Sequence, residues 1–281
     1  MRFWRGRRRT SPKETWLTWA ARFGYAACGT IYSVIGIAAI AAALGFAREP
    51  TGSHGALHFF AELPLGPVAL ALIGVGLAGY AALNFVGAVL DPEERGVTPW
   101  GLLTRGVDVL TGALYIVFSV TALAMIVDPQ HRAQGAALDI ANRIRETPFG
   151  TMLLTTGGVG LILSGIYLFY RAAREPFGEM LDRRSLSAVT RRAIAIAARA
   201  GTAARGVIFG ICGLTLVLAA EDSALERAGD IGDALSAIGS TTFGPFFLGL
   251  IGAGFVAYGG YQLAKSRYQR IADPVEGVKN A

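Results

Sequence analysis

Long apolar runs constrain the fold of this chain more than any other feature of its sequence. They cover about residues 24–47, 65–90, 106–127, 149–170, 203–220 and 245–264. Because an α-helix rises about 1.5 Å per residue, about 20 residues span a hydrocarbon core of about 30 Å. We therefore predict an all-α integral membrane protein with six transmembrane helices. The fifth run is long enough only if its helix begins near Arg199, and it contains Arg205.

The composition agrees with a membrane location. Of 281 residues, 53% are apolar and 16% are charged, whereas soluble domains carry about 25% charged residues. A net charge of +6 could suit a nucleic acid, but the basic residues lie between the apolar runs. We attribute them to membrane topology and expect no nucleic-acid partner. Cys28 and Cys212 each lie in an apolar run, so the sequence predicts no disulfide framework.

The basic residues lie mainly on one side of the predicted spans. If the chain crosses the membrane six times, 21 Lys and Arg residues lie on the side of the two termini and five lie on the other side. Loops rich in Lys and Arg stay in the cytoplasm. We therefore predict a plasma-membrane protein with both termini in the cytoplasm.

An internal repeat organises the odd-numbered spans. Each has an arginine that is followed at +7 by a small residue, at +10 by an aromatic residue and at +14 by another small residue. The aligned sets are Arg22, Gly29, Tyr32 and Gly36; Arg105, Gly112, Tyr115 and Ser119; and Arg199, Gly206, Phe209 and Gly213. These offsets are heptad a and d positions, so each set forms one stripe of a helix. Small residues on a stripe let another helix approach closely in lipid.

The even-numbered spans repeat as well. Each begins at a glycine, with further glycines at +8 and +10 and a tyrosine or serine at +14. The aligned sets are Gly66, Gly74, Gly76 and Tyr80; Gly150, Gly158, Gly160 and Ser164; and Gly244, Gly252, Gly254 and Tyr258. Mixed segments precede these spans at 56–63, 137–144 and 233–238, and we predict a short amphipathic helix in each.

The sequence therefore predicts one two-helix hairpin that is repeated three times. We divide it into a basic N-terminal segment (1–21), three repeats (22–92, 93–176 and 199–274), a basic linker before the third repeat (177–198) and a tail (275–281). Both ends and the linker are expected in the cytoplasm. Repeats of equal topology can be related by an axis along the membrane normal. Three hairpins could thus close into a pseudo-threefold bundle of six helices.

These motifs resemble a bacterial membrane family catalogued as "domain of unknown function 1206". The resemblance rests on the arginine, glycine and tyrosine of the odd spans and on glycine-rich even spans, one of which begins Pro148-Phe149-Gly150. It covers about residues 20 to 270, and the middle copy departs most, with Asp108 in its first span. The resemblance implies an integral membrane protein with three tandem two-helix units. It implies no agreed activity, cofactor or catalytic residue.

The aligned arginines are the strongest functional candidates. Arg22, Arg105 and Arg199 could form a ring, deepened on one side by Arg205, that binds an anion or an acidic lipid headgroup. The alternative is that each side chain extends to the headgroup region and only anchors its helix.

Other polar residues give weaker signals. Asp108 lies inside a span, where an acid can serve in transport, but an ion pair with Arg105 three residues earlier is simpler. Asn84 and Gln262 are interpreted as hydrogen-bond donors between helices. His54, His58 and Glu62 have the spacing of metal ligands on a helix, although Gly52 and Gly55 argue against a helix there and a solvated face is the plainer reading.

No sequence motif indicates an enzyme: the chain lacks H-E-x-x-H, G-x-S-x-G, a P-loop and a dinucleotide fingerprint. We expect a non-enzymatic membrane module without a cofactor that binds membrane lipid. A second membrane protein or another copy of the chain are open alternatives as partners. A small transporter or channel that uses Asp108 and the arginines is the alternative function.

Overall fold

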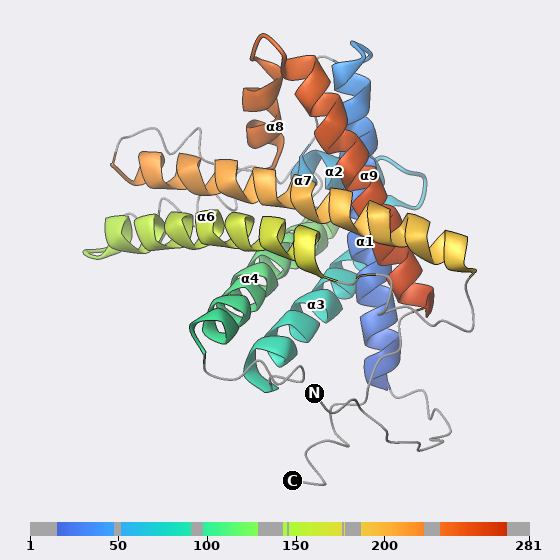
Figure 1. The fold of residues 1–281 in the computed structure, drawn as a ribbon, viewed down its shortest axis with the longest axis horizontal. Helices are drawn as coiled ribbons and strands as arrows, with labels where there is room; N and C mark the ends of the chain where they lie inside the picture. The colour runs from blue at the N-terminus through green and yellow to red at the C-terminus, as the bar shows by residue number, and fades with distance from the viewer. Residues whose placement is uncertain are drawn as a thin grey trace, which may run out of the picture.

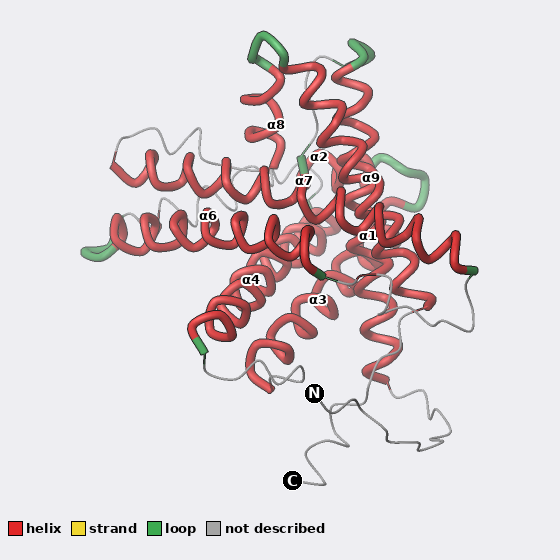
Figure 2. Tube along the Cα trace, in the orientation of Figure 1, coloured by secondary structure: helices red, strands yellow, loops and turns green. Residues whose placement is uncertain are grey.

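The computed structural model describes residues 16–47, 52–90, 98–128, 143–144, 146–175, 177, 187–221 and 231–268, and these residues form helices and short turns without strands (Figure 2). Six helices are long and apolar enough to cross a membrane, as predicted. They are α1 (Trp16–Ala43), α3 (Gly66–Leu90), α4 (Pro99–Val127), α6 (Gly150–Arg174), α7 (Ala188–Glu221) and α9 (Gly244–Tyr268).

Helix α7 begins much earlier than its apolar run. Its start is set by Ser187, whose Oγ accepts a hydrogen bond from the backbone N–H of Thr190 at 3.1 Å, as a helix N-cap does. The following residues include many alanines, which favour helix although arginines interrupt the apolar pattern. Helix α4 begins in the same way, because Thr98 caps the N–H of Gly101 at 3.1 Å.

Two short helices precede α3 and α9. These are α2 (Ser53–Ala61) and α8 (Ile231–Gly239), and they confirm two of the three short helices predicted from the sequence. The third, at 137–144, lies outside the described residues except for 143–144. Helix α2 includes His54, so the expectation that the glycines on either side would prevent a helix there is wrong.

The six long helices form three antiparallel pairs. The pairs with the most extensive contacts are α3 with α4, α6 with α7, and α9 with α1. Figure 1 shows α6 and α7 side by side across the view, whereas α1 and α9 run from top to bottom. Each pair therefore joins the second helix of one repeat to the first helix of the next, and the third repeat joins back to the first.

Small residues at equivalent positions make all three pairs possible. The contacts join Gly252 to Gly36, Gly158 to Gly213 and Gly74 to Ser119. A Cβ added at Gly36 would lie 2.6 Å from the carbonyl oxygen of Gly252, and one added at Gly158 would lie 2.7 Å from that of Gly213. In the third pair, the Oγ of Ser119 donates a hydrogen bond to the carbonyl oxygen of Gly74 at 2.7 Å.

The glycines at +10 form a second contact face, toward the first helix of the same repeat. A Cβ added at Gly254 would lie 2.6 Å from the Cβ of Ala204 on α7, and Gly76 meets Ala27 of α1 in the same way. In the middle repeat Leu110 occupies the aligned position. A Cβ added at Gly160 would lie 3.9 Å from its Cδ2. The larger side chain keeps α4 and α6 apart, and their contact is the least extensive of the three within repeats.

Each second helix thus lies between the first helix of its own repeat and the first helix of the next. Because this holds for α3, α6 and α9 in turn, the three repeats close into a ring with pseudo-threefold symmetry. The first helices α1, α4 and α7 all begin at one end of this ring, where α3, α6 and α9 end. We call this the basic end, because Arg22, Arg105 and Arg199 lie in the first helices near it.

Candidate functional site

A buried arginine lies at the centre of the bundle. Arg205 of α7 is 6% exposed. Its guanidinium carbon lies 4.9 Å from the ring centroid of Tyr258, 5.1 Å from that of Phe209 and 5.5 Å from that of Tyr32. One of its terminal nitrogens donates a hydrogen bond to the phenol oxygen of Tyr258 at 2.6 Å.

The repeat explains why aromatic residues surround Arg205. Tyr32, Tyr115 and Phe209 occupy the aligned aromatic position of the three first helices, and all three are buried. The position six residues after the aligned arginine is Cys28 in the first repeat, Thr111 in the second and Arg205 in the third. All three of these are buried as well. Equivalent positions therefore converge on the core, but only the third repeat places a charge there.

A chain of hydrogen bonds runs beside this arginine. The Nε2 of Gln262 donates to the Sγ of Cys28 at 3.4 Å and to the phenol oxygen of Tyr80 at 3.0 Å. The phenol oxygen of Tyr115 lies 3.3 Å from the Sγ of Cys28 and donates to that of Tyr32 at 3.3 Å. Since Tyr115 uses its proton toward Tyr32, the thiol of Cys28 donates to Tyr115. The cluster of Arg205, Tyr258, Tyr32, Tyr115, Cys28 and Gln262 is called the core polar cluster below.

The charge of Arg205 is stabilised mainly by the rings. Among the described residues no Asp or Glu side chain forms an ion pair with it. Burying an ion costs several kcal/mol, whereas a desolvated cation–π contact contributes about 2 kcal/mol. Three ring faces can thus offset much of this cost. The Nε of Arg205 and the Oε1 of Gln262 nevertheless lack hydrogen-bond partners in the described part of the chain.

The aligned arginines have three different surroundings. Arg22 is half-buried, with its guanidinium carbon 5.7 Å from the ring centroid of Trp19. Arg105 is also half-buried, and its Nε donates to the carbonyl oxygen of Ala88 on α3 at 2.6 Å. Arg199 is exposed. The sequence placed them at one end of the bundle, and the hypothesis that they share a ligand stays a prediction.

More cations lie near the basic end. The last turns of α6 and α9 contain Arg171, Arg174, Lys265 and Arg267. Arg171 forms an ion pair with Glu175. The Nζ of Lys265 lies 4.1 Å from the ring centroid of Tyr25 and 5.6 Å from that of Tyr261. Positive charge therefore continues from the basic end toward the core polar cluster.

The polar residues singled out in the spans behave differently from one another. Gln262 donates to side chains on α1 and α3, which confirms its role between helices. Asn84 donates to the carbonyl oxygen of Tyr80 on its own helix at 2.7 Å. Asp108 is half-buried against α3, since a Cβ added at Gly87 would lie 3.7 Å from its Oδ2.

The metal-ligand hypothesis concerns α2 and the residue after it. His58 is half-buried in α2, and Glu62 is exposed directly after the helix. The side chain of His54 lies outside the described part of the structure. Where side chains are described, no group of three His, Cys, Asp or Glu residues could hold a metal ion.

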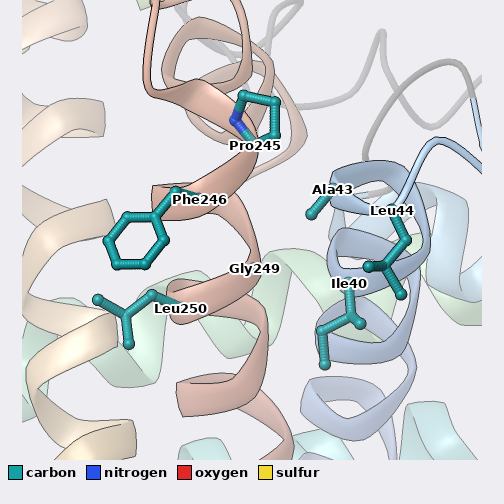
Figure 3. A pocket seen from close by; sticks show the side chains of 7 residues that line it. All are labelled: Ile40, Ala43, Leu44, Pro245, Phe246, Gly249 and Leu250. Atoms are coloured by element: carbon teal, nitrogen blue, oxygen red, sulfur yellow. The ribbon is translucent and has the colours of Figure 1, made fainter.

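A groove of about 440 Å³ lies between the end of α1 and the start of α9 (Figure 3). It is lined by Ile40, Ala43, Leu44, Pro245, Phe246, Gly249 and Leu250. No polar side chain lines it, so it offers space for hydrocarbon but no group for chemistry.

Sequence reasoning found some members of the core polar cluster and missed others. Arg205 was a candidate, and Tyr32 and Tyr115 were placed on the packing stripe. Cys28 was considered only as a cysteine in an apolar run outside any disulfide framework, and Tyr80 and Tyr258 were aligned without a role. The aligned position of Cys28, Thr111 and Arg205 could have signalled the site, because two polar residues and a thiol there are unusual inside apolar spans.

Comparisons with known proteins agree with the repeat. The family model described as "Domain of Unknown Function (DUF1206)" matches residues 23–91, 109–175 and 200–269. The protein named "Uncharacterized protein YxxB" from Bacillus subtilis (strain 168) is 28% identical over 261 residues, which are 92% of this chain and 93% of that protein. No solved structure matches the chain. Because the three matched segments together cover most of the chain, one in each repeat, the chain belongs to the DUF1206 family.

Proposed function

We propose that this chain is a non-enzymatic membrane module that binds anionic lipid headgroups at its basic end. The observation that carries the proposal is the closed ring. Arg22, Arg105 and Arg199 occupy equivalent positions of the three first helices, so the symmetry distributes them around one end of the bundle. Guanidinium groups at the membrane surface bind phosphate oxygens in bidentate geometry.

The charge distribution supports this binding and its side of the membrane. In the topology predicted from the sequence, 21 Lys and Arg residues fall on the side of the basic end and five fall on the other side. Basic residues stay in the cytoplasm, whose membrane leaflet carries the anionic lipids. We therefore place the basic end in the cytoplasm and the chain in a bacterial plasma membrane, for which the Bacillus relative gives further support.

The test compares lipid binding of the full chain and of arginine variants. The chain is placed in nanodiscs of phosphatidylcholine with increasing phosphatidylglycerol, and bound lipid is counted by native mass spectrometry. A juxtamembrane cation contributes about 1 kcal/mol, so Arg22→Gln, Arg105→Gln and Arg199→Gln should each weaken phosphatidylglycerol binding roughly fivefold. The triple variant should lose its preference over phosphatidylcholine.

Arg143→Gln is the matched control, because Arg143 is exposed at the opposite end of the bundle. It should leave the preference for phosphatidylglycerol unchanged. If the triple variant binds phosphatidylglycerol as well as the wild type, the three arginines only anchor their helices and the proposal is wrong.

A further inference from the structure

The surroundings of Arg205 contain more hydrogen-bond donors than acceptors. Its Nε–H has no acceptor in the described part of the chain. The phenol oxygen of Tyr258 accepts from Arg205, and that of Tyr32 accepts from Tyr115. Each of these phenols still has its own O–H to donate. No hydrogen bond between described residues uses either proton, so three donors remain available at this buried cation.

Among the described residues, no carboxylate balances the positive charge of Arg205. The amide oxygen of Gln262 is an acceptor without a partner, one helical turn nearer the basic end, but an amide is neutral. The core polar cluster therefore keeps a net positive charge in a place where a charge alone is costly.

The geometry favours a small spherical anion. A phosphate or carboxylate would bring several oxygens that each need a donor in this buried place, whereas a halide is satisfied by a few donors.

A path of positive charge leads from the basic end to the cluster. Tyr258, Gln262 and Lys265 follow one another at i, i+4 and i+7, so they lie on one stripe of α9. The ammonium group of Lys265 lies against Tyr25 of α1. This stripe places a second cation between Arg205 and the end of the bundle.

We propose that the core polar cluster binds a halide ion, such as chloride, beside the guanidinium group of Arg205, where the Nε–H and the phenol O–H groups of Tyr258 and Tyr32 are the available donors. This site lies within the ring, about 9 Å deeper along α7 than Arg199 at 1.5 Å per residue. It is independent of the lipid-headgroup site proposed above.

The experiment uses the full chain in nanodiscs that contain only phosphatidylcholine, so that anionic lipid plays no part. The ³⁵Cl NMR line of chloride should broaden in the presence of the chain, and bromide should reverse the broadening by competition. The apparent melting temperature should rise with chloride concentration, as mass action requires of a ligand of the native state. Sodium gluconate at equal ionic strength should not raise it. Absence of chloride broadening, or equal stabilisation by gluconate, overturns the proposal.

Variants locate the site. Arg205→Gln should abolish both the broadening and the chloride-dependent shift. Arg192→Gln makes the same change at an exposed position of the same helix and should preserve both. If Arg205→Gln does not fold, Tyr258→Phe decides the matter, because it retains the ring and removes one donor. A Tyr258→Phe protein with undiminished chloride affinity would place the ion elsewhere and contradict the proposed site.

Discussion

At the residue scale, Gly36 lies where a single methyl group would meet another helix. A Cβ at this position would lie 2.6 Å from the carbonyl oxygen of Gly252 and 2.7 Å from the backbone nitrogen of Val256. Because backbone atoms cannot move aside without moving α9, we expect Gly36→Ala to lower the free energy of unfolding by about 1–3 kcal/mol, in the range of overpacked cores. The measurement is thermal unfolding of the purified chain in detergent.

The control for this prediction is Gly260→Ala. Gly260 is an exposed glycine of α9, and nothing lies within 4 Å of an added Cβ. Both substitutions gain the same intrinsic helix propensity, so their difference isolates the contact between α1 and α9. Equal melting temperatures for the two variants would mean that α1 and α9 do not approach as closely as described.

At the element scale, α4 and α6 make the least extensive contact between the two helices of one repeat. The reason is Leu110, which occupies the position of Ala27 and Ala204 in the other repeats. The same change in the third repeat should loosen α7 from α9. The Cβ of Ala204 would lie 2.6 Å from a Cβ at Gly254, which leaves no room for a larger side chain. We expect Ala204→Leu to lower the melting temperature and to increase the distance between spin labels on α7 and α9.

Ala200→Leu is the matched control for this element. Ala200 lies one turn earlier on α7 and its side chain is exposed, so a leucine there should leave both the stability and the distance unchanged. An Ala204→Leu protein with wild-type stability would show that size at this position does not set how closely the helices pack.

The positions of the helices could be predicted from the sequence better than the pairs of helices that pack together. Apolar runs located all six spans, and only α7 began far outside its run, because the alanines and arginines before it favour helix without adding hydropathy. The partners were harder to predict. The glycines at +8 and +10, such as Gly252 and Gly254, are about 200° apart around a helix, so they face two different neighbours. A pattern of small residues indicates that another helix packs closely there, but it does not identify that helix.

For the whole molecule, the ring is symmetric in its contacts and asymmetric in its core. Aligned small residues hold every pair together, and the aligned arginines lie at one end. The buried position six residues after the aligned arginine differs, with Cys28, Thr111 and Arg205 in the three repeats. Sequence alignment could list these three residues, but it could not show what surrounds them. The contact of Arg205 with Tyr32 depends on the third repeat joining back to the first, which the sequence left as one possibility.

Closure of the ring can be tested by joining its first and last helices. Ala43 of α1 and Gly249 of α9 face each other across the apolar groove (Figure 3), and a Cβ at Gly249 would lie 3.5 Å from the Cβ of Ala43. Disulfides need Cβ atoms about 3.5–4.5 Å apart. The double variant Ala43→Cys with Gly249→Cys should therefore oxidise to an intramolecular disulfide in the membrane, which migrates faster on a denaturing gel and reverts on reduction.

The native cysteines and chance collisions need separate controls. Each single variant reports any bridge to Cys28 or Cys212. The double variant Ala43→Cys with Gly260→Cys places cysteines on the same two helices, but nothing lies within 4 Å of a Cβ at Gly260, so this pair should stay reduced under the same oxidant.

If the facing pair forms no more disulfide than this control, residues 43 and 249 are not neighbours. In that case α9 does not pack against α1, and an open row of three repeats would describe the molecule better than a ring. The core polar cluster would then lose its basis too, because Gln262 and Tyr258 reach Cys28 and Tyr32 only through this pair of helices.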